Sequence, residues 1–390
     1  MEEKEQVAKA LLKAAQKAST PDDLTEPRVD DAMRRSAMEA FGSWERALAA
    51  GLIRAVKDSD SSRASRRKPA AADVDRKVTE AFQDPIYIET ADGKLFTFRG
   101  PDLAVRERAH LLDEAGLVDV IRAVHYVGDS DAVFAFSDQG RFFGIDRRMI
   151  PAWEMRGERR SIRDALFLTK EEGIRALVPR RKMVSGRVLH VTRGGKGKAT
   201  DASEYGDGLD RSGRTAFKVR DGDVPISVMG TPRETTVFCA SALGRGIHFE
   251  ASEIRSMGRN AVGVNVMKLS GEDDAVVGAF EGKRVRQLAV ITEQGLGKRV
   301  DFSEFRTQGR NGRGMQLARI NPGDRLASVT PCNPAADVAI TSSEGRVWRL
   351  PAGNFFLMGR PAKGNPMVEL AEGEKIVHLT ALPCGGEMDS

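Results

Sequence analysis

The chain has 390 residues, 41% of them hydrophobic and 30% charged, which suits a folded protein with room for more than one domain. The net charge of +5, with a pI near 9.1, is a mild indication of a polyanionic partner. No apolar run reaches the length of a membrane span and the start, MEEKEQ, is acidic, so we expect no membrane segment or signal peptide. Three widely spaced cysteines favour a reduced, cytoplasmic protein.

Residues 1–56 have the pattern of a small helical module. Apolar residues recur at helical spacing in EQVAKALLKAAQKA, and Ser43 is a good N-cap for ERALAAGL. The stretch AFGSWERALAAGL (40–52) resembles the homing-endonuclease-associated repeat, which implies a helical unit that contacts DNA. The alternative is a helical hairpin in which Phe41 and Trp44 are simply core residues, and the sequence leaves both open.

Residues 57–83 have the composition of a flexible linker. Ser, Ala, Asp and Arg dominate in KDSDSSRASRRKPAAADVDRK and apolar residues almost vanish. The basic cluster at 63–68 could contact phosphates, although a basic linker is more often just solvated.

A motif then recurs with a fixed period. It reads EIRSMGRNAVGVNVMKL at 253–269, EFRTQGRNGRGMQLARI at 304–320 and NFFLMGRPAKGNPMVEL at 354–370. The Gly-Arg pairs end at Arg259, Arg310 and Arg360, so the period is about 50 residues, which is typical of a propeller blade or solenoid unit.

Each copy has a β-branched run leading into a glycine hairpin upstream, and a Gly or acidic turn downstream. One unit therefore reads strand, Gly turn, strand, Gly-Arg turn, strand, Gly/Asp turn, strand, which is the content of a propeller blade. Weaker copies centre on Gly93 and Gly140 and occupy 185–228, with Gly213-Arg214 as the matching turn. We therefore predict a mainly β fold, a six-bladed β-pinwheel or propeller over 84–384. An insertion at 156–182 could form strands or short helices.

The Gly-Arg turns are the candidate binding positions. Glycine and asparagine tolerate the left-handed backbone of such turns, which would leave the arginine pointing outward. In a ring of six units these arginines would form a row of positive charge that suits DNA phosphates. An exposed turn arginine with no binding role is the alternative. The residues that we place in this row are Arg214, Arg255, Arg259, Arg306, Arg310, Arg313, Arg360 and Lys363.

The repeated segments, IHFEASEIRSMGRNAVGVNVMKL and KRVDFSEFRTQGRNGRGMQLARI, resemble the C-terminal domain of the DNA gyrase A protein, and more loosely that of topoisomerase IV. The resemblance covers about 84–383. It implies a six-bladed β-pinwheel that bends duplex DNA around a basic outer edge.

One departure from that family concerns its glycine-basic box, Gln-Arg-Arg-Gly-Gly-Lys-Gly. Here Arg193-Gly194-Gly195-Lys196-Gly197 lacks the leading Gln-Arg and lies at a hairpin of the third unit. We interpret it as a phosphate-facing loop that carries Arg193, Lys196 and Lys198. An ordinary Gly-rich hairpin is the alternative.

The second departure is the lack of catalytic residues. The three tyrosines follow Ile86, His125 and Glu204, whereas the gyrase cleavage tyrosine follows an arginine. There is no ATPase motif, the histidines have no metal-ligand spacing, and Asp273-Asp274 reads as solvated turn carboxylates. We expect no enzyme activity and no cofactor.

The sequence thus predicts a nucleoid-associated protein that bends or wraps duplex DNA and so modulates its topology. The alternatives are an accessory component of a type IIA topoisomerase and a propeller scaffold that binds protein. Lys and Arg on one rim would favour DNA, and an apolar patch would favour protein.

Overall fold

The computed structural model describes residues 85–90, 95–99, 121–127, 132–151, 162–183, 186–206, 211–220 and 222–382. The chain divides into two units, 1–78 and 79–390, and all described residues belong to the second. The predicted helical module and linker lie outside the described residues and stay predictions.

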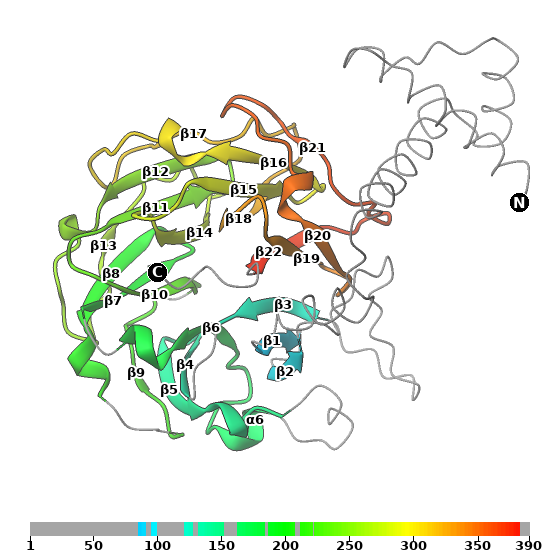
Figure 1. The fold of residues 1–390 in the computed structure, drawn as a ribbon. Coiled ribbons are helices and arrows are strands. Elements are labelled where there is room, and N and C mark those ends of the chain that lie inside the picture. Colours follow the sequence, from blue (N-terminus) through cyan, green and yellow to red (C-terminus); the bar gives the residue numbers. More distant parts are fainter. Residues whose placement is uncertain are drawn as a thin grey trace, which may run out of the picture. The chain divides into compact units, whose positions relative to one another are not determined.

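The described residues form six antiparallel sheets, so the prediction of a six-bladed propeller is confirmed (Figure 1). Blade 1 consists of β1 (Pro85–Thr90), β2 (Leu95–Arg99) and β3 (Ile121–Tyr126). Blade 2 consists of β4 (Ala132–Ser137), β5 (Arg141–Asp146), β6 (Ile174–Pro179) and β9 (Arg214–Thr215). Blade 3 consists of β7 (Arg187–Thr192), β8 (Lys196–Asp201), β10 (Pro225–Thr231) and β13 (Val264–Asn265).

The remaining blades repeat this pattern. Blade 4 consists of β11 (Thr236–Ser241), β12 (Arg245–Glu250), β14 (Val276–Glu281) and β17 (Met315–Gln316). Blade 5 consists of β15 (Gln287–Thr292), β16 (Leu296–Asp301), β18 (Leu326–Cys332) and β21 (Asn365–Pro366), and blade 6 of β19 (Asp337–Ser342), β20 (Val347–Pro351) and β22 (Ile376–Leu382).

Short helices join the strands. They are η2 (Arg147–Met149), α6 (Ile162–Ala165), η4 (Arg180–Met183), η5 (Ala202–Tyr205), η6 (Ala251–Glu253), η7 (Phe302–Glu304) and η8 (Ala352–Asn354). The insertion at 156–182, whose structure the sequence left open, contributes α6, the strand β6 and η4. No helix among the described residues is long and apolar enough to cross a membrane.

The outer strand of four blades belongs to the following sequence unit. β9, β13, β17 and β21 have two residues each, and they pair with β5, β8, β12 and β16 of the preceding unit. The third strand of the predicted unit therefore leaves its own blade and completes its neighbour. Each unit is thereby tied to the next by main-chain hydrogen bonds as well as by packing.

Apolar clusters fill the space between neighbouring blades. Leu189 and Val191 of blade 3 pack with Val237 and Ile247 of blade 4, and comparable clusters join the other consecutive blades. Blade 6 returns to blade 1, where the Thr380 hydroxyl donates to the Val124 carbonyl at 2.5 Å. Blades 6 and 1 are therefore in contact, and the ring closes between β22 and β3.

One acidic side chain in each downstream turn holds the neighbouring hairpin. Asp274 is 5% exposed and accepts the main-chain N–H groups of Leu243, Ser270 and Ala275. Asp324 accepts in the same way from the backbone of Gln294. The interpretation of Asp274 as a solvated carboxylate is therefore wrong, because the backbone donors of the adjacent turn replace water.

Candidate nucleic-acid interface

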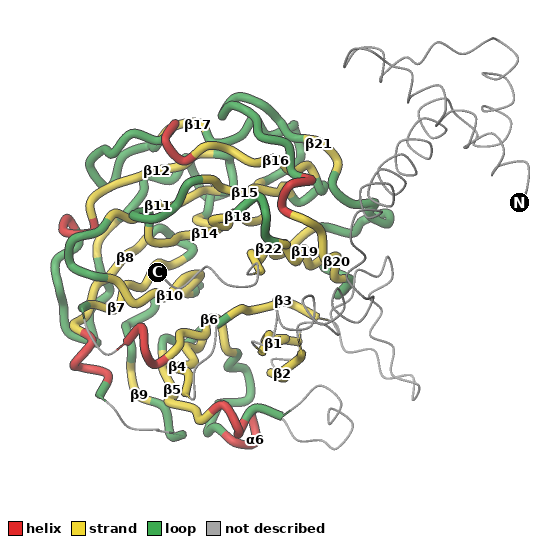
Figure 2. Tube along the Cα trace, in the orientation of Figure 1, coloured by secondary structure: helices red, strands yellow, loops and turns green. Residues whose placement is uncertain are grey.

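Three equivalent stretches lie on the rim of the ring, and we call them the outer segments: residues 255–268, 306–319 and 356–369. Each begins along the edge of the preceding unit's blade, where the N–H groups of Met257, Gln308 and Met358 donate to main-chain carbonyls at 2.8, 2.8 and 2.9 Å. Each then passes through the Gly-Arg turn into the two-residue outer strand. Loop stretches consequently lie outside the strands of these blades (Figure 2).

The three Gly-Arg arginines do not point outward as expected. Arg259 and Arg360 are about 30% exposed, and their Nε atoms lie 3.9 and 3.5 Å from the Oε2 atoms of Glu204 and Glu304 of the preceding unit. Arg310 donates through Nε to the main-chain carbonyl of Glu253, whose carboxylate accepts the Arg310 N–H. Each of these arginines therefore joins its own unit to the preceding one, through an ion pair or a hydrogen bond.

Two buried lysines hold the same turns from inside. The Nζ atom of Lys298 donates to the carbonyls of Gly359 and Arg360 at 2.9 and 2.8 Å, and Lys198 does the same for Gly258 and Arg259 at 3.2 and 2.8 Å. Burial lowers the pKa of each ammonium to about 8. The expectation that Lys198 faces phosphate is thus wrong, because its side chain is 1% exposed.

Arg214 also differs from its expected position. It lies on β9 opposite Phe142, and Val264 of β13 occupies the same place in the next blade. Gly213-Arg214 is therefore the equivalent of Gly263-Val264 and not of Gly258-Arg259. The guanidinium of Arg214 lies 4.8 Å from the ring centre of Phe142.

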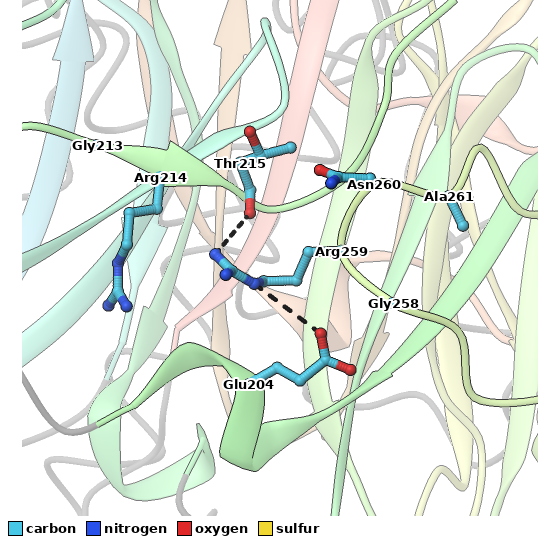
Figure 3. A pocket seen from close by; sticks show the side chains of 8 residues that line it. All are labelled: Glu204, Gly213, Arg214, Thr215, Gly258, Arg259, Asn260 and Ala261. Carbon is cyan, nitrogen blue, oxygen red and sulfur yellow. Dashed lines mark hydrogen bonds and ion pairs between the residues drawn. The ribbon is translucent and has the colours of Figure 1, made fainter.

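An open hollow of about 830 Å³ lies at the junction of the third and fourth units. Arg214 and Arg259 both line it, and Arg259 extends between Glu204 and the Thr215 carbonyl, to which it donates at 3.1 Å (Figure 3). Arg214 donates to the carbonyl of Tyr205 at 2.7 Å. Both guanidinium groups are engaged, so we interpret the hollow as a seam between units.

Five of the six remaining predicted residues are exposed. Arg255, Arg306, Arg313 and Lys363 are exposed on the outer segments, and their side chains make no hydrogen bond or ion pair with other described residues. At the β7–β8 hairpin, Arg193 is exposed, whereas Lys196 is half-buried and donates to the Asn265 side chain at 2.5 Å.

Two exposed basic residues of the outer segments, Lys268 and Arg319, were missed, and Lys218 is exposed at the equivalent position of the third unit. The N–H of Lys268 donates to the Gly312 carbonyl beside Arg313, and the N–H of Arg319 donates to the Ala362 carbonyl beside Lys363. Each thus lies against the basic residue of the next unit. The sequence did hold a signal, because both follow their Gly-Arg arginine by the same spacing.

Six side chains together form what we call the basic belt: Arg255, Lys268, Arg306, Arg313, Arg319 and Lys363. All six are exposed, and they come from three successive outer segments that touch one another. Such a row offers cationic partners to a polyanion at intervals along the rim. Among the described residues no cluster of His, Cys, Asp or Glu could hold a metal ion.

A family model described as the DNA gyrase C-terminal domain, beta-propeller, matches residues 235–281, 286–333 and 336–383, which are the fourth to sixth units. The DNA gyrase A protein of Aminobacterium colombiense is 28% identical over 299 residues, or 74% of this chain and 35% of the relative. The DNA gyrase A protein of Escherichia coli K12 is 27% identical over 263 residues, or 67% and 30%. The chain thus spans about a third of the length of these relatives.

Solved structures share the fold. A DNA gyrase A C-terminal domain superposes with a TM-score of 0.66 at 20% identity and covers 77% of this chain and 99% of its own. The C-terminal domain of DNA topoisomerase IV gives 0.60 at 19% identity and covers 77% and 94%.

Proposed function

Because the propeller belongs to the DNA gyrase A C-terminal domain family, we propose that this protein binds duplex DNA on its basic belt and bends it, without catalysis of its own. The belt is the observation that carries the proposal. Its six cationic side chains are exposed, whereas the half-buried arginines beside them already have partners within the ring. Affinity would come from phosphate contacts and counterion release, with little preference for sequence.

The bend follows from the position of the belt on a closed ring. Smoothly bending 20–30 bp of duplex costs on the order of 1–6 kcal/mol, so one or two phosphate contacts would leave the DNA straight. Several contacts along a curved row can offset that cost. We further propose that the protein is cytoplasmic and nucleoid-associated, and that it serves as an accessory DNA-wrapping part for a type IIA topoisomerase whose catalytic domains are in another chain.

A protein-binding scaffold is the second candidate. The adjacent residues Phe356 and Leu357 are 61% and 52% exposed, and they favour that function. Two side chains make a small patch compared with the apolar surfaces at which proteins dock, so we rank this candidate lower.

A gel shift with random-sequence duplex at several salt concentrations tests the proposal. The triple variant Arg306→Ala, Arg313→Ala, Arg319→Ala should weaken binding and reduce the slope of log affinity against log salt by about three. The matched control, Lys283→Ala, Arg284→Ala, Arg286→Ala, removes the same charge from the exposed connection between β14 and β15. Equal effects of the two triple variants would overturn the assignment of DNA to the belt.

A further inference from the structure

The last outer segment of the rim carries fewer basic residues than the two before it. Segment 255–268 has two Arg and one Lys, and segment 306–319 has four Arg, with no acidic residue in either. Segment 356–369 has one Arg and one Lys, and it ends at Glu369. Since the arginine of each Gly-Arg turn contacts the preceding unit, Lys363 is the one belt residue that this last segment contributes.

The exposed positions of the segments correspond one to one. Phe356 occupies the place of Arg255 and Arg306, counted from the Gly-Arg turn, and Leu357 occupies the place of Ser256 and Thr307. The isolated bridges support this register, because Ser256 pairs with Ala199 of β8 and Leu357 with the equivalent Arg299 of β16.

Among the described residues, Arg299 is the cation beside Phe356, and it does not take the place of Arg255 and Arg306. Arg299 lies under this stretch, but its Nε donates to the Phe355 carbonyl at 2.6 Å and its Nη1 to the Gln287 side chain at 2.6 Å. Its guanidinium group is therefore held by two neutral oxygen acceptors, one on β15 of blade 5 and one in the following unit.

The other end of the segment reverses its sign. Glu369 is exposed and stands where Lys268 and Arg319 stand in the two preceding segments. The nearby Arg346 donates to the Glu369 carbonyl and forms an ion pair with Glu374, so its charge is already matched. A phosphate placed here would meet a carboxylate, which repels it, where the two preceding segments offer an ammonium or guanidinium group, which attracts it.

We propose that the DNA path on the rim has a defined end. The duplex lies on segments 255–268 and 306–319 as far as Lys363 and leaves the rim beside Phe356 and Glu369. The protein then bends DNA along one arc of the ring and does not encircle it there. This inference rests on the proposed function and adds the extent of the contact to it.

Photo-crosslinking measures that extent. A photo-reactive phenylalanine derivative is placed at position 255, 306 or 356 of the full chain, bound to a labelled random-sequence duplex at saturating protein. Positions 255 and 306 should crosslink several-fold more than position 356. Introducing the photo-reactive residue biases the experiment against this result. It removes an arginine at 255 and 306, which weakens DNA binding there, whereas at 356 it only replaces one aromatic ring by another. Equal crosslinking at 356 would overturn the proposed end.

A gain of contact gives an independent test. Glu369→Lys should tighten binding and raise the salt slope by about one, because it extends the belt by one contact. Glu344→Lys makes the same charge change on the exposed β19–β20 turn and should do neither. If Glu369→Lys gains no more than Glu344→Lys, the DNA does not come near Glu369 and this carboxylate does not end its path as proposed. Absence of any duplex binding by the wild type would remove the proposed function itself, whereas intact binding with a null gain removes only its end.

Discussion

Replacement of Lys298 by Met tests how the rim is held in place. The wild-type ammonium donates to the carbonyls of Gly359 and Arg360, and both bonds connect blade 5 to the turn of the following unit. Each of these partly buried carbonyls costs up to about 3 kcal/mol if it is left without a donor. Part of that loss is offset because the variant no longer buries a charge, whose desolvation already lowers the lysine pKa. We expect the free energy of unfolding to fall by about 2 kcal/mol at pH 7.

The pH dependence separates this effect from simple packing. The pKa of Lys298 is about 8 in the folded chain, against 10.5 for an unperturbed lysine, so the unfolded chain binds more protons between these two pH values. Wild-type stability from this group therefore rises with pH across that window, by up to about 3 kcal/mol. The methionine variant lacks this rise, so the stability difference between wild type and variant should grow from pH 8 to pH 10.

Urea unfolding followed by circular dichroism at pH 7, 8, 9 and 10 measures the difference. Lys196→Met is the control, because Lys196 is half-buried on β8 of blade 3 and donates to the Asn265 side chain, so this variant loses a lysine without releasing a Gly-Arg turn. Ile247 stands at the equivalent position of blade 4, so an apolar side chain fits the site sterically. A stability difference that stays constant from pH 7 to pH 10 would refute the burial of the Lys298 ammonium that lowers its pKa.

Four further outcomes are expected, each for a different feature of the ring. Gly244 has φ +75°, and a Cβ there would lie 2.5 Å from the Ala318 carbonyl oxygen, whereas Gly323 has φ +78° and open space around it. In urea unfolding, Gly244→Ala should therefore lower the free energy of unfolding by much more than the loss of about 1 kcal/mol expected for Gly323→Ala. Arg360→Ala should destabilise the chain by about 1 kcal/mol through loss of its contacts with Glu304 and Phe305, and Arg306→Ala should leave the unfolding curve unchanged. Burial lowers the pKa of His378 to about 4, so wild-type stability should fall as the pH drops from 6.5 to 4, and His378→Gln should flatten that fall in an acid titration followed by circular dichroism. Relaxation of a closed plasmid by a nicking-closing topoisomerase in the presence of the protein should trap a shifted linking number that shrinks as salt rises, and an unshifted distribution at full occupancy would leave a binder that does not bend DNA.

The sequence by itself determined the repeat and therefore the number of blades. A period near 50 with glycine hairpins at Gly244, Gly295 and Gly345 can be read without coordinates, because hairpin turns of this kind require a residue that tolerates positive φ. The same regularity placed Arg255, Arg306, Arg313 and Lys363 on turns near the rim, where they are exposed.

Only the tertiary structure decided which basic residues are available to a partner. Arg259, Arg310 and Arg360 recur most strictly in the sequence, yet they contact the preceding unit, because the outer strand of each unit pairs with its neighbour's blade. That exchange depends on pairing between segments about 50 residues or more apart, which local propensity does not encode. Spacing alone could not distinguish an arginine that contacts the preceding unit from one that belongs to the basic belt. The burial of Lys198 likewise depends on which carbonyls the next unit brings over it.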